Sequence, residues 1–97
     1  MKYQIILAPE AVQDLKRLNA HDRAKVKDLI EEHLRHTPTK ISKSRIKKLR
    51  GLRHPQYRLR IDEIRVFYDI EESTVQILAI IAKSKAAQWL KEVGEQK

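Results

Sequence analysis

The chain has 97 residues, of which 41% are apolar, so it can bury one small core and is too short for two domains. It contains no cysteine, which excludes a disulfide-stapled scaffold and a thiolate metal site. Its formal net charge of +8 favours a polyanionic partner, and no apolar run approaches the roughly 20 residues that span a membrane. We therefore expect one soluble, cytoplasmic domain over residues 1–97, with no membrane contact.

The first third of the chain predicts a short strand followed by a helical hairpin. β-Branched and aromatic residues at 3–7 are typical of a strand, and Pro9 both ends it and suits the first position of a helix. A second helix is expected from residue 21 or 22 to residue 36, and the short join predicts that the two helices are antiparallel. The positions along one face are Val12, Leu15 and Leu18 in the first helix, and Val26, Leu29, Ile30, His33 and Leu34 in the second.

The next segments predict a basic surface stretch and a β-hairpin. Residues 40–53 are expected at the surface, with at most one helical turn. Residues 57–61 alternate strictly between apolar and basic side chains, and 64–70 again place apolar residues on one face. Asp62 and Glu63 between them are a candidate two-residue turn.

The last third predicts a strand and a closing helix. Residues 75–82 are almost continuously apolar, which is typical of a central strand covered on both faces. A helix is expected from 84 to 93, with Ser84 as its N-cap. The predicted order is β-α-α-β-β-β-α, a small α+β domain whose mainly antiparallel sheet carries the helical hairpin on one face.

Positive charge is concentrated in one quarter of the chain. Ten of the 21 basic residues lie between Lys40 and Arg65, where only Asp62 and Glu63 oppose them. The remaining residues contain equal numbers of acidic and basic side chains and are therefore neutral overall. Solubility does not require such segregation, so the pattern indicates a surface that binds a polyanion such as nucleic acid.

The predicted hairpin brings two arginines together. Counting outward from a turn at Asp62 and Glu63 places Arg60 directly opposite Arg65 on the solvent side, with Arg58 two residues along the same face. Directly opposed like charges destabilise a sheet by a few tenths to about 1 kcal/mol. An anion between the guanidinium groups accounts for the pair, and phosphate suits their forked donors. Alternatively, both arginines extend into water or pair with a carboxylate such as Asp69.

Three segments carry a resemblance to a known protein family. They are Lys48-Leu49-Arg50-Gly51-Leu52, Tyr57-Arg58-Leu59-Arg60-Ile61 and Ile64-Arg65-Val66-Phe67-Tyr68. Together with the helix that ends in Arg17-Leu18, they resemble the core signature of RelE/ParE-superfamily toxins of bacterial and archaeal type II toxin–antitoxin systems. The resemblance covers nearly the whole chain and implies the order of elements predicted above.

The resemblance implies a RelE-like, ribosome-dependent endoribonuclease that cuts mRNA in the decoding site and inhibits translation. Such toxins use no metal or cofactor, and the RNA 2′-oxygen attacks the adjacent phosphorus. By position, Arg58 and Arg60 match the family's basic pair on the first hairpin strand, and Arg65 matches the arginine that contacts the scissile phosphate. An acidic antitoxin is the implied protein partner, in a hetero-oligomer.

The resemblance weakens after the last strand. Relatives often have a His-Arg or Lys-Arg pair followed by tyrosine, whereas this chain has Lys83-Ser84-Lys85 and then Trp89. We expect Lys83 or Lys85 to replace the missing proton-transfer group, and Trp89 to be either a core anchor or a stacking platform for a base. The expected catalytic residues are Arg60, Arg65, Lys83 and Lys85, and the expected RNA-binding residues are Lys47, Lys48, Arg50, Arg53, Arg58 and Trp89.

Two other functions fit the same residues. A ParE-like toxin would poison DNA gyrase with the same basic face, and a degenerate toxin would bind nucleic acid without catalysis. The histidines predict no metal site, because neither a cysteine nor a His-carboxylate motif accompanies His33 and His36. His54, next to the basic segment, is interpreted as an ordinary loop residue.

Overall fold

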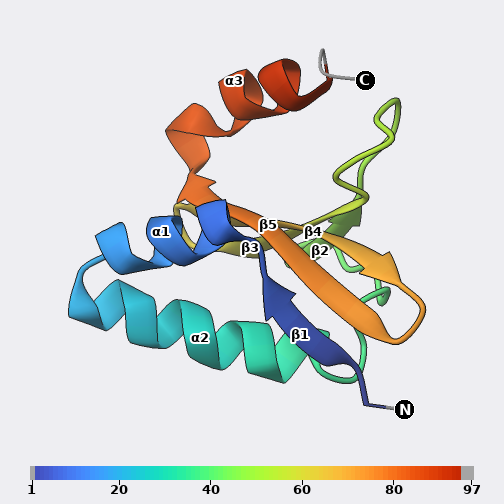
Figure 1. The fold of residues 1–97 in the computed structure, drawn as a ribbon, viewed down its shortest axis with the longest axis horizontal. Coiled ribbons are helices and arrows are strands. Elements are labelled where there is room, and N and C mark those ends of the chain that lie inside the picture. Colours follow the sequence, from blue (N-terminus) through green and yellow to red (C-terminus); the bar gives the residue numbers. More distant parts are fainter. Residues whose placement is uncertain (1, 95–97) are drawn as a thin grey trace.

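The computed structural model describes residues 2–94 and contains a mixed sheet with helices on both faces (Figure 1). The strand order is β1-β5-β4-β3-β2, with β1 parallel to β5 and all other neighbouring pairs antiparallel. In chain order the elements are β1 (Gln4–Leu7), α1 (Pro9–Arg17), α2 (Ala20–Leu34), β2 (Ile46–Lys48), β3 (Tyr57–Ile61), β4 (Ile64–Glu71), β5 (Thr74–Ala82) and α3 (Lys83–Gly94). The α+β class and the helical hairpin are confirmed.

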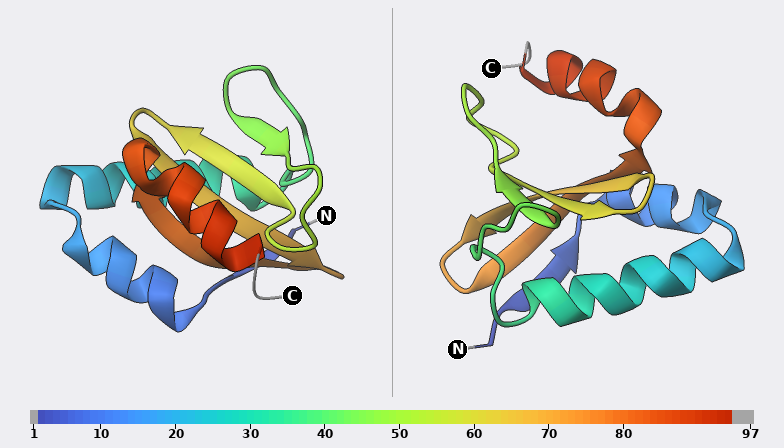
Figure 2. Two further views of the ribbon diagram at one scale, coloured as in Figure 1. Left: turned by 90° about the horizontal axis from the view of Figure 1, so that it is seen from above. Right: turned by 180° about the vertical axis from the view of Figure 1, so that it is seen from behind.

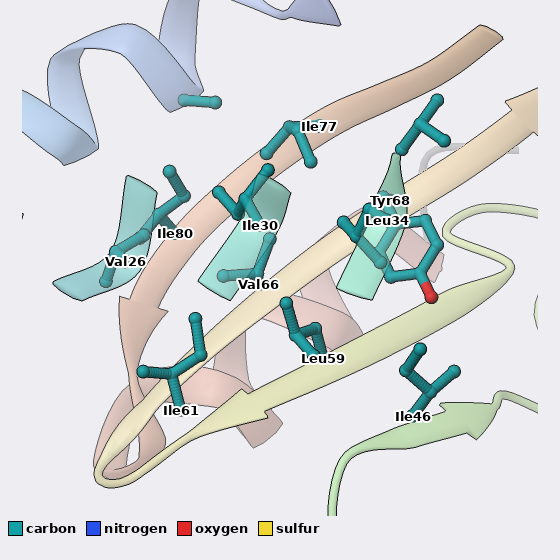
Figure 3. Packing of buried hydrophobic residues seen from close by; sticks show 12 residues of the cluster. Val26, Ile30, Leu34, Ile46, Leu59, Ile61, Val66, Tyr68, Ile77 and Ile80 are labelled. Carbon is teal, nitrogen blue, oxygen red and sulfur yellow. The ribbon is translucent and has the colours of Figure 1, made fainter. Parts of the chain in front are cut away.

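The core lies between the helical hairpin and one face of the sheet, while α3 lies across the other face (Figure 2). Figure 3 shows side chains of α2 among those of the central strands. Because strand side chains alternate, the strands that bury this core send their other side chains toward α3. The core members labelled there are Val26, Ile30, Leu34, Ile46, Leu59, Ile61, Val66, Tyr68, Ile77 and Ile80.

Polar contacts fix the helical hairpin and dock it on the sheet. The Asn19 side chain caps α2 by accepting a hydrogen bond from the backbone N–H of Asp22 at 2.8 Å. The guanidinium of Arg23 donates to the carbonyl oxygen of Leu18 at 2.7 Å and so satisfies the end of α1. Asp14 of α1 accepts from the backbone N–H of Ile80 at 3.0 Å, two residues beyond the register shift in β5.

One strand, β2, was not predicted. Ile46 is 2% exposed and pairs with Leu59, and Lys47 pairs with Arg58, so part of the basic surface stretch extends the sheet. The order is therefore β-α-α-β-β-β-β-α. A strand of three residues, with one apolar side chain, is too short to show alternation in the sequence.

Smaller differences concern element ends and covering. Helix α2 ends at Leu34 rather than His36, and α3 begins at Lys83, so Ser84 lies inside its first turn and is not the N-cap. Strand β5 is internal, as predicted, but Gln76 is exposed, so its second face is only partly covered. No helix in residues 2–94 is long and apolar enough to cross a membrane.

The β3–β4 hairpin has the predicted register. Ile61 pairs with Ile64, Leu59 with Val66, and Arg60 with Arg65. Asp62 has φ = 52°, a left-handed conformation that aspartate tolerates better than most residues and that tight hairpin turns require. The turn therefore forms without glycine.

Removing the Tyr68 hydroxyl should destabilise the fold. This hydroxyl is buried and donates to the carbonyl oxygen of Pro38 at 2.6 Å, and burial raises the pKa of Tyr68, which keeps it protonated. Tyr68→Phe leaves that carbonyl unpaired and should lower the free energy of unfolding by about 1–2 kcal/mol in urea titrations. Tyr57→Phe is the matched control, because Tyr57 stacks on Tyr68 with 5.4 Å between ring centroids and that stack needs no hydroxyl. Equal losses in the two variants would contradict this role of the Tyr68 hydroxyl.

Candidate nucleic-acid interface

Three arginines lie together on the face of the sheet that α3 crosses. In the hairpin register Arg60 is directly opposite Arg65, and Arg58 is opposite Phe67, so alternation puts all four side chains on one face. Among the described residues, no ion pair joins Arg58, Arg60 or Arg65 to a carboxylate. The expected pairing of this cluster, called the arginine cluster below, is confirmed.

One N–H group of the Arg58 side chain lacks a hydrogen-bond acceptor among the described residues. This side chain is partly buried, and its Nε is buried without a partner in the described part of the chain. Burial lowers the pKa of Arg58 below its ordinary value, and the positive charges of Arg65 and Arg60 lower it further. A buried donor without an acceptor is costly, and an anion would supply the acceptor and offset the repulsion.

The sequence predicted Arg65 on the solvent side, but the structure buries it. It is 7% exposed, and its Nη1 donates to the carbonyl oxygens of Asp62, at 2.7 Å, and Ile64, at 3.1 Å. The guanidinium folds back onto the carbonyls of its own hairpin turn, and strand alternation does not predict such a contact. Arg65 therefore stabilises the hairpin turn in addition to contributing its charge.

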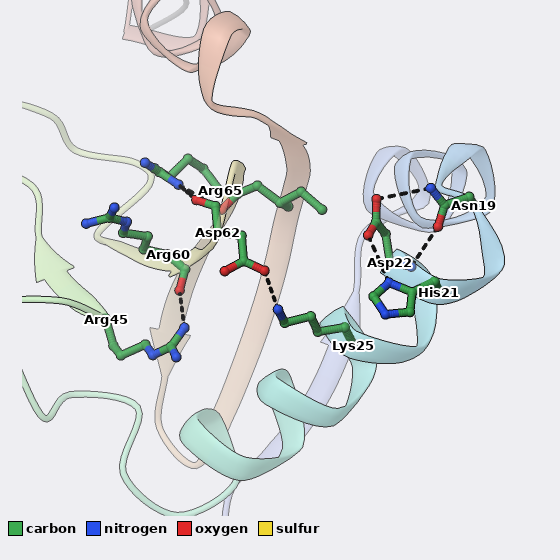
Figure 4. Close-up of polar contacts among 9 residues, drawn as sticks. Asn19, His21, Asp22, Lys25, Arg45, Arg60, Asp62 and Arg65 are labelled. Carbon is green, nitrogen blue, oxygen red and sulfur yellow. Dashed lines mark hydrogen bonds and ion pairs between the residues drawn. The ribbon is translucent and has the colours of Figure 1, made fainter.

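The turn that carries Arg60 and Arg65 is anchored from several sides (Figure 4). Lys25 of α2 forms an ion pair with Asp62, and this hydrogen bond lowers the pKa of the Asp62 carboxyl. Arg45 Nη1 donates to the carbonyl oxygen of Arg60 at 3.1 Å. The Asp62 carboxylate is thus bound directly to a lysine of α2, and Arg60 of the cluster acts on it only through its charge, which lowers the Asp62 pKa further.

A basic flank continues from the cluster to the edge of the sheet. Lys47 of β2 pairs with Arg58 and extends the row of cations, and Lys48 follows it along the edge strand. Arg50 and Arg53 are exposed in the loop after β2. A hollow in this flank is lined by both apolar and basic residues, namely Ile41, Lys47, Lys48, Leu49 and Arg50.

The residues expected after β5 lie near the cluster in two different roles. The backbone N–H of Lys83 donates to the carbonyl oxygen of Glu63 at 2.7 Å, so α3 starts at the hairpin turn, and the side chains of Lys83 and Lys85 are exposed. Trp89 stacks on Phe67 with 4.9 Å between ring centroids and 21° between ring planes. That stack occupies one face of the indole and makes Trp89 a packing anchor of α3 on the sheet.

One contact near the cluster was not predicted from the sequence. His54 Nδ1 lies 2.7 Å from Oδ2 of Asp69, although the two residues are 15 positions apart. The predicted register could have indicated it, because extending the pairing by one residue places Gln56 opposite Asp69. Among the described residues no group of three or more histidine, aspartate and glutamate side chains could hold a metal ion.

Known proteins show which family has this fold. Residues 5–87 match the family model of the ParE toxin of type II toxin-antitoxin system, parDE. The chain belongs to this toxin family. No curated protein matches the toxin by sequence.

Solved structures of related toxins share the fold. The RelB–RelE antitoxin–toxin complex of Methanococcus jannaschii is 25% identical, with a TM-score of 0.68 over 87% of this toxin and 96% of that chain. The RelBE2 toxin–antitoxin complex of Mycobacterium tuberculosis is 24% identical, with a TM-score of 0.73 over 84% of this toxin and 99% of that chain. A free, doubly substituted variant of Escherichia coli RelE is 17% identical, with a TM-score of 0.74 over 99% of this toxin and 97% of that chain.

Removing one cation from the cluster should stabilise the free toxin. Arg60 is exposed and faces Arg65 directly, so Arg60→Ala relieves like-charge repulsion and should raise the free energy of unfolding by a few tenths to about 1 kcal/mol at low salt. Arg50→Ala, in the exposed loop, should leave the stability unchanged. Urea unfolding of both variants measures the difference. Marked destabilisation by Arg60→Ala would show that Arg60 has a structural role instead.

Proposed function

We propose that this toxin inhibits translation by cutting mRNA in the ribosomal decoding site, without a metal ion. The observation that supports this best is the arginine cluster, three guanidinium groups on one sheet face with no carboxylate partner in residues 2–94. Solubility alone does not require arginines that repel one another on one face of the sheet. Action on ribosomes would also require a cytoplasmic location.

Phosphodiester cleavage by the RNA 2′-oxygen suits such a site. Negative charge develops on the phosphorane as the 2′-oxygen attacks, and preorganised guanidinium groups stabilise that charge. Arg58 and Arg60 would contact the phosphate directly, and the buried Arg65 would act mainly through its charge and by holding the turn. Lys83 or Lys85, at the start of α3, would donate a proton to the leaving oxygen.

The basic flank would hold the RNA on either side of the reacting phosphate. Lys47, Lys48, Arg50 and Arg53 can each neutralise a backbone phosphate, and such contacts fix the register without reading sequence. The ribosome would supply the remaining geometry by presenting the mRNA in a fixed conformation.

The proposed protein partner is an acidic antitoxin. The similar toxins of Methanococcus jannaschii and Mycobacterium tuberculosis were solved in complexes with their antitoxins, and the net charge of +8 favours an acidic partner for this chain. A hetero-oligomer in which the antitoxin covers the basic face would keep the toxin from RNA.

A second candidate function is inhibition of DNA gyrase. It is favoured by the family model, which describes a ParE toxin, and by Trp89, which stacks on Phe67 and cannot transfer a proton. In that case the arginine cluster would bind a protein or DNA surface and would cut nothing.

Expression of the toxin in growing cells, followed by mapping of mRNA 5′ ends, tests these functions. We expect cuts at defined codon positions in translated mRNA, and a loss of cutting of about 100-fold in Arg58→Ala, comparable to the removal of one preorganised charge-stabilising donor. Lys27→Ala, on the exposed side of α2, should cut like the wild type.

Other outcomes assign the function differently. Intact mRNA together with an SOS response would support gyrase as the target, and the absence of any growth defect would support a non-catalytic binding protein. If Arg58→Ala abolishes toxicity and a Lys83→Ala/Lys85→Ala double variant remains fully toxic, the lysines do not transfer the proton.

A further inference from the structure

A histidine–aspartate pair lies beside the arginine cluster and is not used by the mechanism above. Nδ1 of His54 is 2.7 Å from Oδ2 of Asp69. Because a carboxylate oxygen can only accept, Nδ1 carries a proton, and in the neutral imidazole Nε2 is then the hydrogen-bond and proton acceptor. The side chain of His54 is 56% exposed, so a ligand on the surface can reach it.

The carboxylate of this pair is itself held in place. Oδ1 of Asp69 accepts from the backbone N–H of Gln56 at 2.7 Å, and the side chain of Gln56 accepts from the backbone N–H of Ile70 at 2.9 Å. Asp69 is 14% exposed at its side chain, so little freedom remains to it. An imidazole whose Nδ1–H is bound by a fixed carboxylate has the tautomer and orientation of a general base.

The pair lies at one end of the arginine cluster. Alternation along β4 puts Arg65, Phe67 and Asp69 on the same face. Arg58 is opposite Phe67, so Asp69 is its diagonal neighbour, at a typical Cα separation of roughly 7–8 Å. The start of α3 is bonded to the hairpin turn at the other end of the cluster. The cluster therefore lies between the imidazole on one side and Lys83 and Lys85 on the other.

We propose that His54 is the general base of the cleavage reaction, an inference that rests on the proposed function. Nε2 takes the proton of the RNA 2′-hydroxyl as the O2′–P bond forms. The P–O5′ bond then breaks, and the leaving oxygen takes a proton from Lys83 or Lys85. The products are a 2′,3′-cyclic phosphate and a 5′-hydroxyl, and the imidazolium and the lysine exchange protons with water to restore the site. Base and acid at opposite ends of the cluster suit an in-line displacement, in which attacking and leaving oxygens lie on opposite sides of phosphorus.

Asp69 would act as a positioning residue. Among the described residues it is the charged group in contact with His54, and it stabilises the imidazolium that forms when the 2′-proton is taken. Arg53 precedes His54 in the chain and Arg58 is the diagonal neighbour of Asp69 across the strands, and bound phosphate would neutralise both cations. Asp69→Asn keeps an oxygen for the N–H of Gln56 but presents an amide N–H₂ group to Nδ1, which favours the wrong tautomer.

Single-turnover cleavage of mRNA on purified, toxin-bound ribosomes tests the proposal. His54→Gln should cut about 100-fold or more slowly than the wild type, the range for loss of a general base. The wild-type rate should fall on acidification, because a protonated imidazole cannot take the 2′-proton, and this fall should be absent in His54→Gln. Asp69→Asn should retain the binding of ribosomes and lose most of the rate.

The chain offers a matched control in His21, an exposed histidine that also lies near an aspartate, Asp22, at 3.5 Å, but on α2 at the other face of the sheet. His21→Gln should cut like the wild type. A His54→Gln protein that cuts within roughly threefold of the wild-type rate, with the same fall at acidic pH, would overturn the role of His54 and leave the proposed function intact. A wild-type toxin that leaves ribosome-bound mRNA uncut would overturn both. Loss of ribosome binding in His54→Gln, with an unchanged rate at saturation, would make His54 a binding residue and also overturn the proposal.

Discussion

The two-residue turn between β3 and β4 determines the position of every cation in the arginine cluster. Side chains on a strand alternate between faces, so a slip of one residue between β3 and β4 would put Arg58 and Arg60 on the opposite face of the sheet from Arg65. The left-handed conformation of Asp62 closes the turn, and the Lys25 ion pair and the Arg65 hydrogen bond hold it in that form. Apolar and basic side chains alternate along β3, so the register that buries the apolar side chains also puts the arginines on the opposite face.

The charged face lowers the stability of the free protein. A directly opposed arginine pair and a buried guanidinium N–H without a partner are both unfavourable, and the neighbouring carboxylates of Asp62 and Asp69 are bound to Lys25 and His54 instead. Unfavourable charge that is kept in place by well-formed contacts is typical of sites that bind an oppositely charged ligand. The ligand would satisfy what the fold leaves unsatisfied.

Much of this arrangement could be predicted from the sequence, and the failures have physical reasons. The alternation of residues 57–61 and 64–70 determined the hairpin register, and helical spacing determined the buried face of α2. Strand β2 escaped prediction because its pairing depends on one buried side chain, Ile46. The burial of Arg65 depends on how its guanidinium folds onto the turn, and the contact between His54 and Asp69 depends on the path of a loop; no local periodicity records either arrangement. The predicted N-cap at Ser84 failed because β5 continues directly into the helix.

The stack of Trp89 on Phe67 has an optical consequence. Trp89 is the chain's single tryptophan, and it connects α3 to the strand that carries Arg65. Its fluorescence therefore reports on one contact in the molecule, the packing of α3 on the basic face. An antitoxin, a ribosome or a short RNA that presses or lifts this helix would change the emission directly, so the protein carries its own probe for occupancy of the site.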